Sequence, residues 1–305
     1  MKKLISILFI AILSLSVTLM GACSGKSVDK QFKGNYQQAT QEQSAQIAQE
    51  LTNEDATSIN KVLQGATVTE KMTMKSTSSV MGQSATMTVG YNFKGGYYQN
   101  QMVLGGNMSV SMMGKKLKTA IDSYSQIDLT NNLLKSYIKM ESAGEEEKMM
   151  NTTHFNNCWN GLFTMGGNVA GEEAGGNTVS FVDIFAAISQ DGGEIYFETT
   201  ETGTKYKIIL DTYYKNALDE IYSESMSDYE GININVTINE ATLYLVLDTQ
   251  GNLVDLMQDF SVAVNMKMSE DGVSMKTTVK MSIQTVIHVD ETYTITPPTD
   301  LETYD

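Results

Sequence analysis

Several residue types are scarce in this chain of 305 residues, and each scarcity argues against a class of protein. No arginine occurs, so all 21 basic residues are lysine, and the guanidinium fork that grips phosphates and carboxylates is absent. Of the two cysteines, Cys23 directly follows the N-terminal apolar run, and the two isolated histidines with the one remaining thiol cannot build a tetrahedral zinc site without carboxylates from elsewhere. The only two prolines are adjacent near the C-terminus, so no proline-rich linker divides the chain.

The charge is strongly acidic and unevenly distributed. The formal net charge is −15 at pH 7. Residues 24–139 carry 12 lysines against 8 acidic residues, whereas residues 140–305 carry 7 lysines against 28. No long run of basic residues occurs, and an acidic chain is repelled by phosphate backbones. The sequence therefore predicts that nucleic acid is not a partner.

Candidates for catalysis are few. His154 precedes Cys158 in the segment HFNNC, but no third residue nearby would orient such a pair. His288 falls on the polar side of an alternating segment, where an exposed position is expected. Phosphate-binding loops, dinucleotide fingerprints and nucleophile elbows are absent from the sequence. We therefore expect a protein without enzymatic activity, cofactor or metal, in which Cys158 is a small buried apolar residue.

The N-terminal segment resembles the export signal of bacterial lipoproteins. Lys2 and Lys3 precede an apolar run, residues 4–20, which is short for a bilayer span. The segment LMGAC resembles a lipobox, which implies cleavage before Cys23 and a diacylglycerol thioether on its sulfur. Two acyl chains, such as palmitate, suffice for stable anchoring. An ordinary signal peptide with an incidental cysteine, and an uncleaved anchor, are the alternatives.

Acylation of Cys23 would determine the location and the division of the chain. With Cys23 modified, Cys158 has no partner within the chain, so no disulfide is expected. We predict a lipoprotein signal peptide over residues 1–22, a lipidated tether over 23–40 and one domain over 41–305. The protein would be anchored on the extracytoplasmic face of a cell membrane, and the absence of arginine favours a Gram-positive source.

Most of the predicted domain alternates apolar and polar residues. The segments DFSVAVNMKM and KTTVKMSIQTVIHVD are the clearest, and turn residues occur at Gln250-Gly251-Asn252 and Asp271-Gly272. A period of two is typical of antiparallel strands with one face in water. About 10–11 strands are expected, with helices over residues 41–64, 180–189 and 213–229 and an acidic, glycine-rich loop over 145–177.

Apolar residues of one parity on these strands, together with one face of the third predicted helix, form a candidate ligand cavity. Methionine is frequent, with 20 in the chain, and its flexible side chain suits surfaces that accept varied apolar shapes. Methionine that merely fills a core is the alternative interpretation. The candidates are Met72, Met74, Met87, Val89, Tyr91, Leu218, Ile221, Tyr222, Phe260, Val262, Val264, Met266, Met281 and Ile283.

The order of these elements resembles that of the LolA/LppX-like lipoproteins, specifically an uncharacterised Gram-positive branch. The segments KYKIILDTYYKNALDEIY, INEATLYLVLDTQGNLVDLMQDFSVAVNMKM and TYTITPPTD carry the resemblance, the last as a proline-containing terminal strand. It implies an α+β, mainly β fold: a curved, antiparallel, incomplete half-barrel with helices packed on its concave face. It also implies a cavity that binds a lipid or another apolar ligand. A surface interaction or sensor module with a solid core is the alternative.

The lipid anchor gives a first prediction. Replacing the lipobox cysteine, Cys23→Ala, should remove the protein from the detergent-phase lipoprotein fraction, because no other cysteine follows an export signal. Phase partitioning and the intact mass of the mature protein measure this. If the variant still carries acyl chains, the lipobox interpretation is wrong.

Overall fold

The described part of the chain forms a single large sheet with few helices. The computed structural model describes residues 29–53, 62–80, 83–128, 130–131, 133–154, 194–212, 214–216, 232–270 and 273–304. The helices are η1 (Lys30–Phe32), α2 (Gln41–Asn53) and η2 (Leu301–Thr303). The strands are β1 (Gln37–Gln38), β2 (Gly65–Val80), β3 (Gln83–Tyr98), β4 (Gln101–Met112), β5 (Lys115–Asp128), β6 (Leu133–Ser142), β7 (Glu145–His154), β8 (Ile195–Thr200), β9 (Gly203–Ile209), β10 (Ile232–Asp248), β11 (Leu253–Glu270) and β12 (Val273–Val289).

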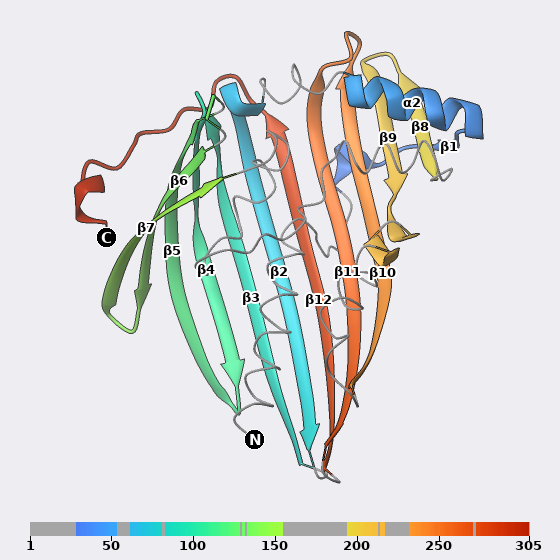
Figure 1. Cartoon of the computed structure of the whole chain (residues 1–305). Coiled ribbons are helices and arrows are strands. Elements are labelled where there is room, and N and C mark those ends of the chain that lie inside the picture. The colour runs from blue at the N-terminus through green and yellow to red at the C-terminus, as the bar shows by residue number, and fades with distance from the viewer. Residues whose placement is uncertain are drawn as a thin grey trace.

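Twelve strands form one antiparallel sheet that curves but does not close into a barrel (Figure 1). Their order is β1-β8-β9-β10-β11-β12-β2-β3-β4-β5-β6-β7, so β1 and β7 are the two edges. The predicted mainly β, incomplete barrel is confirmed. The expected count of strands was slightly low, in part because β1 has only two residues, too few for a periodic signal.

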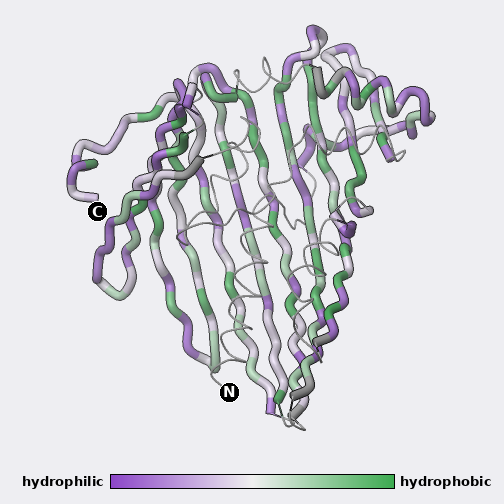
Figure 2. The backbone as a smooth tube through the Cα atoms, in the orientation of Figure 1, coloured by the Kyte–Doolittle hydropathy of each residue, from purple (hydrophilic) through white to green (hydrophobic). Residues whose placement is uncertain are grey.

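Strand register separates the sheet into two faces. Phe260 on β11 lies opposite Ile283 on β12, which lies opposite Met72 on β2, and Met72 lies opposite Tyr91 on β3. Because side chains alternate along a strand, the residues in between point to the other side. We call the side with Met72 the apolar face and the side with Lys71 the polar face. Figure 2 shows the resulting alternation of apolar and polar residues along the strands.

Helix α2 lies across β9 and β10 at one end of the sheet and packs on the apolar face (Figure 1). Its Ala48 is fully buried, and Ile47 and Leu51 pack against the same hydrophobic core. The helix begins at Gln41 because Thr40 and Gln43 form a reciprocal capping box, with N···O distances of 2.9 and 3.3 Å. The expected helix over 41–64 is therefore confirmed for residues 41–53 and 62–64.

The predicted tether is wrong for residues 29–40, which belong to the folded domain. Phe32 is fully buried against Tyr244 and Met257 on the polar face. The Tyr36 hydroxyl donates to the Phe32 carbonyl oxygen at 2.6 Å, and burial raises the pKa of Tyr36 to about 12. Two aromatic residues in a polar segment lack periodicity, so the sequence did not indicate this docking.

The C-terminal tail is not the predicted proline-containing strand. After β12 the chain turns at Asp290, whose carboxylate accepts hydrogen bonds from the Thr292 amide and hydroxyl at 3.0 and 2.6 Å. The tail then packs Ile295 and Tyr304 against Tyr124 and Tyr137 on the polar face. Its two prolines have no amide hydrogen to offer to a strand ladder, which explains why no strand forms.

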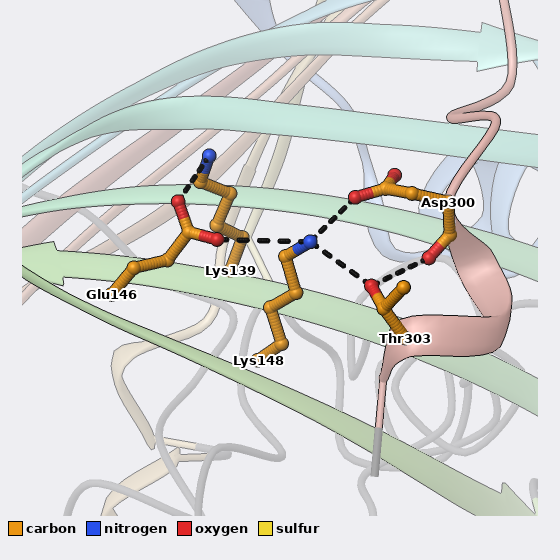
Figure 3. A network of polar contacts seen from close by, with 5 residues as sticks. All are labelled: Lys139, Glu146, Lys148, Asp300 and Thr303. Atoms are coloured by element: carbon orange, nitrogen blue, oxygen red, sulfur yellow. Dashed lines mark hydrogen bonds and ion pairs between the residues drawn. The ribbon is translucent and has the colours of Figure 1, made fainter.

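An ion-pair network holds the end of the tail against β7 (Figure 3). The Lys148 ammonium lies 2.5 Å from the Asp300 carboxylate, donates to the Thr303 hydroxyl at 3.0 Å and lies 3.6 Å from Glu146. Glu146 also pairs with Lys139 on β6 at 2.7 Å. The acidic run 145–147, expected to belong to a loop, is instead the start of edge strand β7, where charge discourages pairing with another sheet.

Other predicted elements are only partly within the described residues. The turn at Gln250-Gly251-Asn252 is confirmed, with the Asp248 carboxylate accepting from the amides of Gln250 and Asn252 at 2.8 Å each. β11 and β12 form the predicted second hairpin, although Asp271 and Gly272 lie outside the described part of the chain. The helix over 180–189 and most of the one over 213–229 also lie outside it.

The buried centre of the apolar face gives a second prediction. Phe260 is fully buried and packs its ring 5.0 Å from that of Tyr214. Phe260→Ala should lower the free energy of unfolding by about 3–5 kcal/mol, because it leaves a cavity that the surrounding side chains fill only partly. Urea unfolding measures this, and Ser261→Ala, the next residue on the polar face, is the control. Equal midpoints for the two variants would contradict this packing.

Candidate functional site

The residues predicted to line a ligand cavity share the apolar face wherever the structure describes them. Met74 on β2 lies opposite Met281 on β12 and Val89 on β3, and Val262 on β11 lies opposite Met281. Eleven candidates lie on this face: Met72, Met74, Met87, Val89, Tyr91, Phe260, Val262, Val264, Met266, Met281 and Ile283. Leu218, Ile221 and Tyr222 lie outside the described residues, so their part in a cavity stays a prediction.

Burial of the apolar face falls from β11 towards β5 near the β4–β5 turn. Phe260, Val262 and Met281 are at most 1% exposed, whereas Val89 on β3 is only partly buried and Leu117 on β5 is 52% exposed. At the other end of these strands the face stays buried, since Tyr97 on β3 and Met102 on β4 are at most 2% exposed. The β11–β12 region is therefore a packed core, and accessible apolar surface lies on the ends of β3 to β5 nearest the β4–β5 turn.

A pocket of about 420 Å³ separates the C-terminal part of α2 from the apolar face. Leu51 of α2, Tyr206 of β9 and Leu247 of β10 supply its apolar lining. Threonines 199, 200, 204 and 249, with Asp248 and two glycines, supply its polar rim. The volume lies in the range of small-molecule sites, which combine apolar walls with a few polar groups.

A second pocket, of about 500 Å³, lies beside the first half of β10. Asp211 and Lys215 line it together with residues 234–238. The Asp211 carboxylate accepts a hydrogen bond from the Ala241 amide at 2.6 Å, where β9 stops pairing with β10. Ile234, Val236 and Ile238 form its apolar wall, and Asp211, Lys215 and the strand edge form its polar side.

Three polar side chains form a row across the apolar face. Gln258 on β11 lies opposite Thr285 on β12, which lies opposite Glu70 on β2. The Tyr91 hydroxyl donates a hydrogen bond to the Glu70 carboxylate. Burial raises the pKa of Glu70 above the ordinary value of a carboxyl group, because a carboxylate loses its hydration there, and the Tyr91 hydrogen bond partly opposes this.

Gln258 is incompletely satisfied. Its side-chain amide nitrogen donates to the Tyr214 hydroxyl at 2.9 Å. Among the described residues its amide oxygen has no hydrogen-bond partner, although Gln258 is only 3% exposed. The opposite assignment of the amide would leave the nitrogen unpaired instead. A buried polar atom without a partner lowers the stability of the fold, and this amide oxygen can accept a hydrogen bond from a ligand.

Sequence periodicity did not identify this row, although it contained the signal. Each of the three residues occupies a position of apolar parity: Glu70 between Val68 and Met72, Gln258 between Leu256 and Phe260, and Thr285 between Ile283 and Ile287. A polar residue at such a position departs from the pattern of its strand. Only the strand order shows that the three departures are neighbours.

The histidine on the polar face has an acidic partner. His288 lies on the polar face as predicted, with a ring nitrogen 2.7 Å from the carboxylate of Asp255. Asp255 is buried, whereas the His288 side chain is 53% exposed. The pair lies on the opposite side of the sheet from the apolar face, so it cannot contact a ligand beneath α2.

The remaining predicted site residues lie mostly outside the described chain. Cys23 and Cys158 are not among the described residues, and of His154 only the backbone is described, at the end of β7. Within the described ranges, no group of three or more potential ligands could hold a metal ion. Within the same ranges, no helix is both long enough and apolar enough to cross a membrane.

Comparison with known proteins adds distant structural similarity only. No protein-family model matches the sequence, and no curated protein matches it. Neisserial surface protein A is 7% identical with a TM-score of 0.21, over 74% of this chain and 99% of that one. A DUF1329 family protein from Desulfovibrio piger is 10% identical with a TM-score of 0.23, over 82% and 93%. A domain assigned to outer-membrane lipoprotein sorting, from Vibrio parahaemolyticus, is 10% identical with a TM-score of 0.12, over 80% and 93%. These scores are too low to assign the fold or function of any of them to this chain.

The polar row gives a third prediction. Because the pKa of Glu70 is raised on folding, the folded protein holds that proton more tightly than the unfolded chain does. The contribution of Glu70 to the free energy of unfolding should therefore fall as pH rises from about 4.3 towards the raised pKa. Glu70→Gln should remove this fall and gain stability over the parent as pH rises.

Urea unfolding between acidic and neutral pH measures the difference. Glu302→Gln, which changes an exposed carboxylate of η2, is the matched control and should follow the parent at every pH. Parallel pH profiles for Glu70→Gln and the parent would mean that the carboxyl group is hydrated in the folded protein.

Proposed function

We propose that the protein is a membrane-anchored envelope lipoprotein that binds a lipid or another apolar ligand beneath α2 and catalyses no reaction. The anchor in this proposal is acylated Cys23. Membership of the LolA/LppX-like lipoproteins belongs to the same proposal, since an open sheet with a helix over an apolar face is the architecture which that resemblance implies.

The pocket between α2 and the sheet is the observation that carries the proposal. Helix α2 contacts the sheet through Ala48, which is fully buried, while Leu51 faces an opening of about 420 Å³. Leu51 packs against the core on one side and is only partly buried, so its other side lines the opening. This leaves apolar surface that an acyl chain or a similar group can cover.

The energetics of such binding come from apolar area. Each Å² of apolar surface that the ligand and the pocket remove from water contributes about 25 cal/mol to the binding free energy. The cost of ordering the ligand is subtracted from this sum. The threonines and Asp248 around the opening can accept or donate hydrogen bonds to a polar headgroup.

A surface interaction or sensor module is the second candidate, favoured by the packed β11–β12 core. Val262 and Val264 are at most 2% exposed, so this part of the face is solid. Residues 234–238 of β10 pair with β11 on one side, and no described strand pairs with their other side. A partner could add a strand at that edge.

A pocket-filling variant gives a fourth prediction. Thr204 lines the opening on β9, and Thr204→Phe should lower uptake of a fluorescent fatty acid severalfold because the new ring occupies ligand volume. Thr202→Phe places the same ring on the exposed β8–β9 turn and should bind like the parent.

Native mass spectrometry of residues 24–305, purified without detergent, is the direct test of a ligand. A bound mass that organic extraction identifies as a lipid, and that Thr204→Phe loses, would support a carrier. A clean apo mass with no uptake of added lipid would overturn it in favour of the interaction module.

A further inference from the structure

The turn of the β4–β5 hairpin lies at one end of the sheet (Figure 1), and apolar side chains are exposed there. Met112 is 50% exposed, Met113 is 77% exposed, and Leu117 lies close by at the start of β5. The turn contains only Met113 and Gly114, with φ angles of 50° and 77°. Positive φ at both residues is the geometry of a tight two-residue hairpin turn, and the turn at Ala143-Gly144 has it as well.

Strand register assembles a basic surface at the same end of the polar face. Lys75 on β2 lies opposite Lys280 on β12, and Lys267 on β11 lies opposite Lys276 on β12. Like charges directly opposite each other destabilise a sheet, so these pairs cost stability in the free protein. Together with two lysines of β5 they form the lysine surface, whose six exposed side chains are Lys75, Lys116, Lys118, Lys267, Lys276 and Lys280.

Acidic side chains are nearly absent from these rows. Among the described residues that share register with the lysine surface on the polar face, Glu240 on β10 is the acidic one. The whole chain carries a net charge of −15, so the surface is a local reversal of sign. The absence of any long basic run in the sequence concealed it, because the six lysines come from four strands.

We infer that the hairpin tip and the lysine surface dock the protein on a membrane rich in anionic lipid. Lysines near a bilayer are attracted by anionic headgroups, and methionine and leucine side chains bury their apolar ends among the acyl chains. A soluble polyanion would satisfy the lysines but leave the apolar tip in water. The inference does not depend on ligand binding beneath α2, which lies at the opposite end of the sheet (Figure 1).

Fluorescence of a label at the tip tests the docking in the full-length acylated protein. Met113→Cys in a Cys158→Ser background carries an environment-sensitive dye, and the protein is added to vesicles of phosphatidylcholine alone or mixed equally with phosphatidylglycerol. We expect a blue shift and quenching by brominated lipids in the mixed vesicles, and water-like emission in phosphatidylcholine. Gln250→Cys, on the β10–β11 turn at the opposite end of the sheet and outside the pocket lining, should stay in water in both.

Charge variants separate docking from anchoring, because the acyl anchor is present in every sample. Lys116→Gln with Lys118→Gln should lower the ratio of immersed to exposed label by about tenfold or more. Lys94→Gln with Lys135→Gln removes the same charge from polar-face positions outside the lysine surface and should leave the ratio unchanged. High salt should reproduce the effect of the first pair.

Three results would overturn the inference. The first is a tip label that stays in water on phosphatidylglycerol vesicles. The second is an equal loss of tip-label immersion in the two double lysine variants, which would mean that only the net charge of the protein matters. The third is binding of a soluble single-stranded oligonucleotide that Lys116→Gln with Lys118→Gln abolishes while tip immersion is unchanged, which would assign the lysines to a polyanion.

Discussion

Alternation of side chains with a period of two, kept in register across the long strands, is the constraint on which the rest of this structure depends. A slip of β2 by one residue against β12 would move Met74 to the polar face and Lys75 to the apolar face. The correct register instead places apolar residues beneath α2 and lysines on the opposite side. Every surface that bears on function follows from that separation.

Different segments cover the two faces of the sheet. On the apolar face, α2 covers one end, and burial is complete over β11 and β12 but partial over β3. On the polar face, two segments that are not strands cover the margins: Phe32 and Tyr36 near β10, and the tail with Ile295 and Tyr304 near β5 and β6. These aromatic clusters leave the central and lower polar face to hydrated side chains, which is where the lysine surface lies.

The alternation within each segment was enough to predict the strands, the mainly β class and which described candidate residues share a face. This is because each segment shows the period of two by itself. Strand order was not predictable from it, since β12 beside β2 depends on contacts between residues such as Met281 and Met74, far apart in the sequence. The polar row and the lysine surface were missed for that reason. The docking of Phe32 and of the tail was missed for another: single aromatic residues in polar, aperiodic segments carry no periodic signal.

The pairing of β12 with β2 also sets the order in which the chain can fold. Strands β2 to β7 form one run of sequential hairpins and β8 to β12 another, and the two runs meet only where the last strand reaches the first long one. A chain is synthesised from its N-terminus, so the edge of β2 that pairs with β12 stays unpaired until residues 273–289 have been made. Pairings of such high sequence separation are slow and leave strand edges open to other chains. The pairing of β12 with β2 at the centre of the sheet is thus the last to form. Until it forms, the nascent protein has most need of a chaperone.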